Sequence, residues 1–406
     1  MNKAPHDPYQ ALRFPEYRWF LGGALALTMA TQIQTLVMGW QVYQLTRDPF
    51  SLGLIGLAEA GPFLGLSLLG GWAADHMDRR RLTLVSLLAL ILGAALLLAL
   101  NLGHGPRHAW PFYAIQALAG LGRAFNRPAS SALGTELVPR DAYQSANTWR
   151  SSVFHLGQVV GPALGGLLFG FLGARTAYSV EGVLMLFSFT AMTQVQPRPR
   201  VPVNQPVLRS LGEGVRFVFS QRLVLSAISL DLFAVLFGGA VALLPVFAAE
   251  VLRTGPQGLG LLRAAPAVGS VLMSFWLAHH PPTRFGLALL FCVAGFGLCW
   301  MGFALSVSFL LSLALLALSG ALDNVSVVLR GTLIQTMTPP EMMGRVQAVS
   351  GFFIGSSNEL GAFESGLAAR LLGLVPSVLL GGCMTLGVVG FTGWRVPELR
   401  KLRRLA

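Results

Sequence analysis

Twelve long apolar runs, separated by short polar segments, make up most of this 406-residue chain. Each run has about 20 residues or more, the length that an α-helix needs to cross the hydrocarbon core of a bilayer. Backbone polar groups in hydrocarbon must be satisfied within the segment itself, which favours helices over open strands. The pattern therefore predicts an all-α membrane protein with spans at about 19–45, 51–74, 82–102, 110–135, 144–171, 175–194, 223–249, 257–278, 285–304, 307–335, 344–372 and 374–395.

The polar segments carry the positive charge unevenly. The segment between the second and third runs, Gly71–Leu82, holds Arg79, Arg80 and Arg81. Positive residues collect in short loops on the cytoplasmic side of a membrane. With that side assigned, cytoplasmic segments hold nineteen of the 29 Lys and Arg, external loops hold four, and six fall within spans. We therefore expect both termini in the cytoplasm, an even number of spans, and a place in a bacterial-type inner membrane.

A proline-rich polar segment at 195–210 divides the chain into two halves that resemble each other. An amphipathic helix at about 208–222 follows it and is expected at the cytoplasmic membrane surface. A shift of 200 residues superposes Gly161 and Gly166 on Gly361 and Gly366. We predict a six-helix bundle in 1–194, a linker with the amphipathic helix in 195–222, and a second, pseudo-symmetric six-helix bundle in 223–406.

The composition narrows the function classes. Only 11% of the residues are charged and 54% are hydrophobic, whereas soluble domains have about 25% charged residues. The net charge of +12 fits cytoplasmic loops that face anionic lipid headgroups, and no segment clusters basic and aromatic residues as nucleic-acid-binding faces do. The sequence lacks a Walker-type phosphate loop, a metal-spaced His/Cys cluster and a nucleophile elbow. We therefore predict neither an enzyme nor a cofactor, and no nucleic-acid partner.

Two motifs resemble those of the major facilitator superfamily of transporters. Gly71–Leu82 reads Gly-x-x-x-Asp-x-x-x-Arg-Arg-x-Leu, similar to the superfamily's loop between spans 2 and 3, although His76 replaces its usual Arg and Asp78 its usual Gly. Asp-Arg-Arg-Arg at 78–81 is similar to the branch of macrolide efflux pumps and the enterobactin exporter. The resemblance implies two bundles that alternate between inward-facing and outward-facing states.

By this resemblance the loop is a conformational latch. It implies that Asp75 accepts hydrogen bonds from the start of span 11 near Gly344, and that Arg79 pairs with an acid at the cytoplasmic end of span 4. A carboxylate near a helix N-terminus is stabilised by the helix dipole. The latch residues expected are Gly71, Asp75, Arg79, Arg80 and Glu136; a topology signal alone is the alternative.

Span 5 carries Gly-x-x-x-Gly-Pro-x-x-Gly-Gly, which resembles an element of the superfamily's proton-coupled exporters and favours export. Small residues every four positions give a flat helix face for close packing, and a proline can bend a helix. The residues are Gly157, Gly161, Pro162, Gly165 and Gly166. Ordinary small-residue packing explains the glycines equally well.

Charged residues within the spans are the candidates for chemistry, because each would cost about 3 kcal/mol facing lipid. The resemblance places spans 1, 4, 7 and 10 around a central cavity. We expect an arginine of the first half to pair with a carboxylate of the second, and proton or substrate binding to break the pair; fixed structural ion pairs are the alternative. The cavity candidates are Gln34, Gln41, Arg123, Arg127, Asp231, Asp323, Asn324 and Glu359, and further charges expected in spans are Glu59, Arg150, Glu181, Arg263 and Glu364.

Together these patterns predict a secondary active transporter, a proton-coupled exporter of a small drug-like or siderophore-like molecule. Its expected partners are the substrate, protons and the lipid bilayer, with the proton motive force as the energy source and a monomer as the expected state. Paired arginines in span 4 hint at an anionic substrate. The alternatives are an importer or facilitator of a small solute, a non-transporting membrane sensor, and a lipid flippase-like protein.

Overall fold

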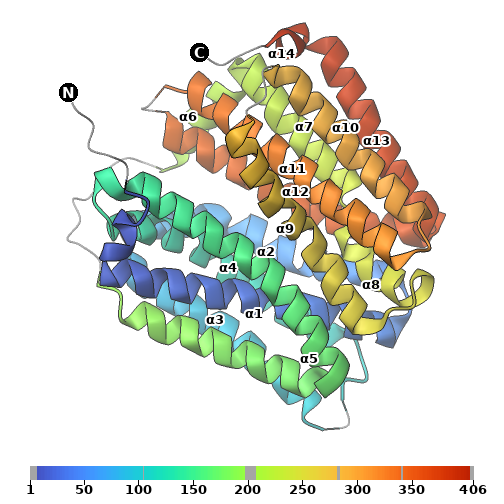
Figure 1. Cartoon of the computed structure of the whole chain (residues 1–406). Helices are drawn as coiled ribbons and strands as arrows, with labels where there is room; N and C mark the ends of the chain where they lie inside the picture. The colour runs from blue at the N-terminus through green and yellow to red at the C-terminus, as the bar shows by residue number, and fades with distance from the viewer. Residues whose placement is uncertain (1–6, 104, 197–206, 281–283, 340–341, 403–406) are drawn as a thin grey trace. The chain divides into compact units, whose positions relative to one another are not determined.

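The computed structural model describes residues 7–103, 105–196, 207–280, 284–339 and 342–402, and in these residues all regular structure is helical (Figure 1). The proline-rich part of the linker, 197–206, lies outside the described residues. The long helices are α1 (Pro15–Thr46), α2 (Pro49–His76), α3 (Arg79–Asn101), α4 (Trp110–Glu136), α5 (Tyr143–Thr193), α7 (Arg222–Gly238), α9 (Gly255–His279), α10 (Phe285–Leu305), α11 (Phe309–Met337), α12 (Met343–Leu372) and α13 (Leu374–Arg395).

Helix α5 accounts for two of the predicted spans. Its 51 residues keep helical dihedral angles through Pro162 and break only at Gly173, which has φ 83° and ψ 175°. A positive φ costs a residue without Cβ little, so this glycine makes the turn that the sequence predicted between 171 and 175. Pro162 lies inside this helix, and its dihedral angles stay helical.

Span 7 is the least regular of the described spans. Helix α7 ends at Gly238, and the chain continues through the 3₁₀ turn η3 (Ala240–Leu243), the short α8 (Leu244–Val246) and the π-helical turn η4 (Phe247–Val251). The sequence pattern predicted one uninterrupted helix here. The break starts at paired glycines, where Gly238 packs directly against the side chain of Thr385 in α13.

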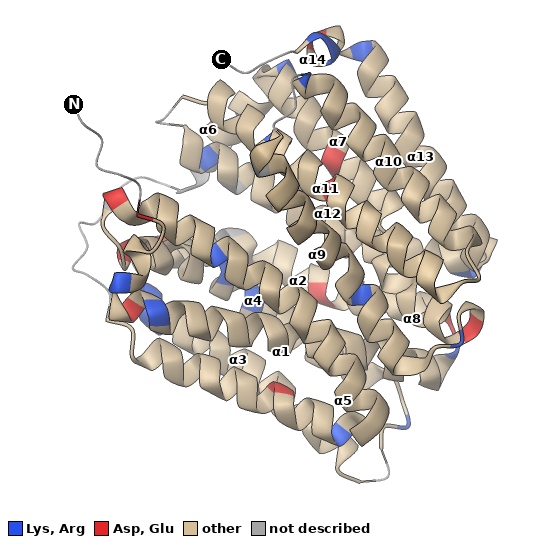
Figure 2. Ribbon diagram, viewed as in Figure 1, with Lys and Arg blue, Asp and Glu red and all other residues tan. Residues whose placement is uncertain are grey.

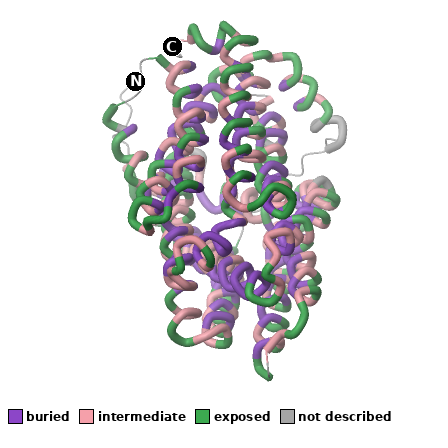
Figure 3. The backbone as a smooth tube through the Cα atoms, turned by 90° about the vertical axis from the view of Figure 1, so that its right-hand side faces the viewer, coloured by how far each residue is buried: buried purple, intermediate pink, exposed green. Residues whose placement is uncertain are grey.

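Within the described residues, nine helices are long and apolar enough by themselves to cross a membrane. Helices α4 and α12 carry more polar and charged positions, and α5 holds two crossings. With these included, the described helices provide the twelve predicted spans. Figure 2 shows long stretches of ribbon without charge along the helices. Along single helices, buried and exposed positions alternate from turn to turn (Figure 3), as expected where one side of a helix faces protein and the other faces lipid.

The chain folds into two compact units, 1–41 with 58–204 and 42–57 with 205–406. In the first unit, α1 and α5 approach closely at small residues. A Cβ on Gly157 would lie 2.7 Å from Thr28 Cγ2, one on Gly161 would lie 2.7 Å from Gln32 Cβ, and one on Gly165 would lie 3.2 Å from Ile33 Cα. The glycine series therefore forms a packing face, the simpler of its two interpretations.

The second unit packs in the same way at α9 and α11. A Cβ on Gly269 would lie 1.7 Å from the carbonyl oxygen of Ala317, and one on Gly320 would lie 2.0 Å from that of Pro266. Ser270 bridges the two helices, since its hydroxyl donates to the carbonyl oxygen of Gly320 at 2.8 Å. Only glycine permits backbones this close.

The second unit also contains 42–57, the end of α1 and the start of α2. Tyr43 donates a hydrogen bond to Glu250, and Asp48 forms an ion pair with Arg370 at 3.5 Å. Phe50 lies 5.9 Å from Phe363, centroid to centroid. This segment is therefore held by polar and aromatic contacts to η4 and α12.

Helix α6 (Val207–Ser220) corresponds to the predicted amphipathic helix. Val218 is fully buried in a cluster with α7 and α12 residues, and Glu213 pairs with Arg345 at 2.5 Å. Val215 and Phe219 remain exposed. The helix therefore packs one apolar side against the protein, and Val215 and Phe219 form a second apolar surface that is exposed.

Candidate functional site: charged clusters within the spans

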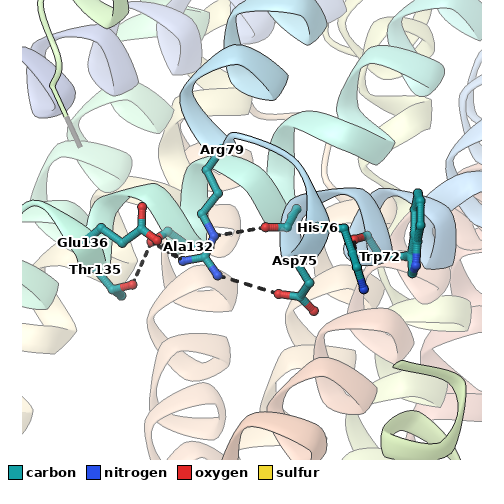
Figure 4. A network of polar contacts seen from close by, with 8 residues as sticks. Trp72, Asp75, His76, Arg79, Ala132, Thr135 and Glu136 are labelled. Carbon is teal, nitrogen blue, oxygen red and sulfur yellow. Dashed lines mark hydrogen bonds and ion pairs between the residues drawn. The ribbon is translucent and has the colours of Figure 1, made fainter. Parts of the chain in front are cut away.

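The loop between α2 and α3 is a compact network of charges (Figure 4). Asp78 caps α3 by accepting a hydrogen bond from the backbone N–H of Arg81 at 2.8 Å. Arg79 lies in the first turn of α3, where its guanidinium contacts Glu136 at 2.7 Å and Asp75 at 3.6 Å. Its Nε donates to the carbonyl oxygen of Ala74 at 3.0 Å. One arginine thus joins α2, α3 and α4.

The position of Glu136 explains the role of the Arg79 side chain at the end of α4. It is the last residue of α4, and the partial negative charge of a helix C-terminus disfavours a carboxylate there. Arg79 offsets both charges, because it also donates to the carbonyl oxygen of Ala132 at 3.4 Å. The contact is the one that the sequence resemblance implied for Arg79. Its role as a latch, with Asp75 at the start of α12, stays a prediction.

The other two latch candidates play different parts. Arg80 donates to the carbonyl oxygens of Met192 and Thr193 at the C-terminal end of α5, where a cation is favoured. Gly71 has open space at its Cβ position, whereas a Cβ on its neighbour Gly70 would lie 2.0 Å from the carbonyl oxygen of Ala124. The close α2–α4 approach therefore belongs to Gly70, which the sequence motif does not single out.

A ring-stacked pair ends both α2 and α9. Trp72 stacks on His76 with centroids 4.9 Å apart, and Trp276 stacks on His280 at 5.1 Å. Each histidine also contacts the carbonyl oxygen of its tryptophan through Nδ1. The two pairs are 204 residues apart, so they give a structural register for the repeat at these helix ends.

The first unit buries a second charged cluster, at the crossing of α2 and α4. Glu59 is 6% exposed; one of its oxygens pairs with Arg123 and the other accepts a hydrogen bond from Gln116. A Cβ on Gly120 would lie 2.4 Å from the carbonyl oxygen of Glu59, so glycine brings the two helices together at the pair. The sequence predicted that an arginine of the first half pairs with a carboxylate of the second. Arg123, one of the two candidates on α4, pairs with an acid of its own unit.

The second unit buries an acidic pair with one arginine. Asp231 on α7 forms an ion pair with Arg330 on α11, and both residues are almost fully buried. Asp323 lies two turns before Arg330 on α11 and interacts electrostatically with both. Asp231 and Asp323 line a small cavity together with Phe296 and Ser326. The cluster is a place where a proton or a cationic group can meet two carboxylates inside the bundle.

The remaining cavity candidates have identifiable places. Asn324 is buried and donates to Ser274 on α9 at 3.0 Å, so it holds two helices together. Arg127 lies over the ring of Phe63, with Cζ 5.2 Å from the centroid. Gln34 is 2% exposed, and Glu359 on α12 is half-buried.

Gln41 belongs to a polar line that crosses the first unit. Its amide nitrogen donates to Asn101 at 2.7 Å, and its oxygen accepts from the hydroxyl of Tyr178 at 2.8 Å. Both ends of the amide are therefore occupied inside the bundle. Gln41, a cavity candidate from the sequence, therefore faces α3 and α5 inside its own unit.

Of the six arginines within the predicted spans, sequence reasoning did not name Arg370 and Arg330. Arg330 is the one that belongs to a buried cluster. It falls within a span and pairs with Asp231, but the sequence analysis named only Asp323 and Asn324 on this helix. Arg330 follows Asp323 by seven residues, which places both on one helical face, and that spacing is the signal available in the sequence.

The comparisons with known proteins agree with this architecture. The family model described as Major Facilitator Superfamily matches residues 18–362. The chain belongs to the major facilitator superfamily. It is therefore a multi-pass membrane transporter protein by family, and not an enzyme.

Curated relatives match nearly the whole length. The multidrug efflux pump Tap of Mycolicibacterium fortuitum is 26% identical over 94% of this chain and 96% of its own. The enterobactin exporter EntS of Shigella flexneri is 28% identical over 90% of this chain and 87% of its own. These are the branches that the loop motif resembled.

Solved structures share the fold. A bacterial homologue of the human lysosomal transporter Spinster superposes with a TM-score of 0.75 at 13% identity, covering 96% of this chain and 98% of its own. A D-xylose–proton symporter superposes with 0.73 at 14% identity, covering 96% and 99%. At this identity the likeness shows the twelve-helix fold alone.

Proposed function

We propose that this chain is a secondary active transporter that exports a small organic molecule in exchange for protons. The observation that carries the proposal is that relatives across at least 84% of the chain, at 26–29% identity, are an efflux pump and enterobactin exporters. The substrate class proposed is drug-like or siderophore-like. Both termini face the cytoplasm, and the working unit is a monomer.

The buried clusters support proton coupling. Asp231, Asp323 and Arg330 place two carboxylates around one guanidinium at a cavity. A buried group of this kind favours one bound proton, because two unneutralised carboxylates repel each other at short range. When Asp323 holds a proton, the three side chains together carry no net charge. When Asp323 releases that proton, Arg330 faces two negative carboxylates. This is a way for proton binding to alter helix contacts between α7 and α11.

Everted membrane vesicles from a host without its own efflux pumps test the proposal. An acidic interior drives protons out through the transporter, and an exporter then accumulates substrate inside. We expect accumulation of ethidium or enterobactin that collapses when a protonophore removes the gradient. Asp323→Asn should abolish it, and Glu398→Gln, an exposed acid on α14 (Pro397–Lys401), should not.

Two results contradict the proposal, and a third contradicts its assignment of proton carriers. Uptake of the same probes by intact cells, driven inward by the gradient, would identify an importer. Failure of the gradient to move either probe in vesicles that contain folded protein would favour the sensor or flippase-like alternatives. Unchanged coupling in folded Asp323→Asn and Asp231→Asn proteins would remove both residues as proton carriers.

A further inference from the structure

Glu181 in the second half of α5 is a fully buried acid that the proposed site does not use. It is 0% exposed. Neither of its carboxylate oxygens has a hydrogen-bond partner among the residues that the structure describes. An ionised carboxylate buried without donors is strongly disfavoured, and such groups take up a proton instead. The surroundings of Glu181 therefore suit the neutral acid.

Within the described part of the chain, the guanidinium that acts on Glu181 is that of Arg123, and it is already engaged elsewhere. Arg123 on α4 interacts electrostatically with Glu181, but its hydrogen bond and ion pair go to Glu59 on α2. With Glu181 neutral, the three groups carry no net charge. With Glu181 ionised, one guanidinium faces two carboxylates in a setting of low dielectric, where such interactions are strong.

A polar line starts at Tyr178, a neighbour of this acid, and ends near the end of the bundle. Tyr178 lies one turn before Glu181 and interacts with it electrostatically. From Tyr178 the line runs through Gln41 to Asn101, the last residue of α3. Arg175 donates to the carbonyl oxygen of Asn101 at 2.7 Å, and the next residue, Leu102, is exposed. This loop is on the side that the charge distribution assigns to the exterior.

We propose that Glu181 is a proton-binding residue of the first unit and that its deprotonation draws Arg123 away from Glu59. No bond is made or broken other than the O–H bond of the acid, and the proton passes to water. Because Gly120 packs against the backbone of Glu59, loosening the Arg123–Glu59 pair acts directly on the α2–α4 contact. The inference rests on the proposed proton-coupled function and adds to it a proton site in the first unit.

Infrared spectroscopy of the reconstituted full-length protein tests the protonation directly. At neutral pH the wild type should show the carbonyl-stretch band of a buried protonated carboxylic acid, and the band should disappear as the pH is raised. Glu181→Gln should lack one such band. Glu398→Gln, which changes an exposed acid on α14, should retain it. A spectrum of Glu181→Gln with every wild-type band overturns the proposal.

Proton release on ligand binding tests the coupling. Ethidium is added to purified protein in unbuffered detergent solution, and its binding is followed by fluorescence. We expect Glu181→Gln to bind ethidium while releasing about one proton fewer than wild type, and Glu181→Asp, which keeps the acid, to restore the release. Equal release from Glu181→Gln and wild type overturns the proposal.

The infrared and proton-release experiments distinguish a failure of this inference from a failure of the proposed function. If ethidium does not bind to the wild type, the proposed handling of drug-like molecules fails, and the infrared arm still decides whether Glu181 holds a proton. If Glu181→Gln does not elute as folded protein, Glu181→Asp takes its place in the infrared arm, where it should shift the band and leave its size unchanged. An unshifted band in Glu181→Asp overturns the proposal.

Discussion

The buried Asp231–Arg330 pair gives the sharpest test of the second unit. The two residues are 6% and 4% exposed, so neither charge has water to replace a lost partner. Removing one member of a buried pair costs about 3–5 kcal/mol, because it leaves an uncompensated charge. Arg330→Met and Asp231→Asn should each lower the free energy of unfolding by this amount.

The double variant should lose much less stability than the sum of the losses in the two single variants. Replacing both members by uncharged side chains of similar size is often nearly neutral. We therefore expect Asp231→Asn combined with Arg330→Met to lie within about 2 kcal/mol of wild type, a coupling energy of at least about 3 kcal/mol in the cycle. The effect should change little with salt concentration, since buried pairs are poorly screened.

Unfolding in mixed dodecyl maltoside and SDS micelles, followed by the loss of helical circular dichroism, measures these values. A double-mutant cycle with Ser326→Ala, a residue that lines the same cavity, serves as the uncharged control. A double variant as unstable as the sum of the singles would refute the reasoning. It would mean that Arg330 is not the group that compensates the charge of Asp231.

Three further outcomes follow from the first unit. Gly161→Val should lower the free energy of unfolding by at least about 3 kcal/mol or abolish folding, since its side chain would overlap the backbone of α1. Gly182→Ala, with open space at the Cβ position, should leave the elution of purified protein unchanged. Glu136→Gln should destabilise by about 1–3 kcal/mol, and combining it with Arg79→Met should add little, as thermal unfolding in detergent can show; full additivity would contradict a direct pair. Asp75→Asn should raise the reactivity of engineered cysteines at the cytoplasmic ends of the spans while substrate binding persists, and unchanged reactivity would contradict the latch.

The helices themselves were readable from the sequence because a membrane leaves so few alternatives. A run of apolar residues must satisfy its own backbone hydrogen bonds in hydrocarbon, so hydropathy and charge fixed nearly every boundary to within a few residues. Span 7 is the exception. Its switch from α-helix to 3₁₀ and π turns begins after Gly238, which packs against Thr385 in α13, a contact between residues far apart in the sequence.

The partners of the buried charges were harder to predict, for a physical reason. Hydropathy says that a charge in a span must be paired, but pairing depends on helix rotation and on which helices touch. An arginine of the first half was expected to reach across the halves, whereas Arg123 pairs with Glu59 on α2, which Gly120 brings close to α4. Small residues therefore decide where charges pair, because they determine which helix surfaces come within reach of a side chain. The same logic leaves Glu181 without a donor: Arg123, the cation that acts on it, is committed to the helix that Gly120 brings closest.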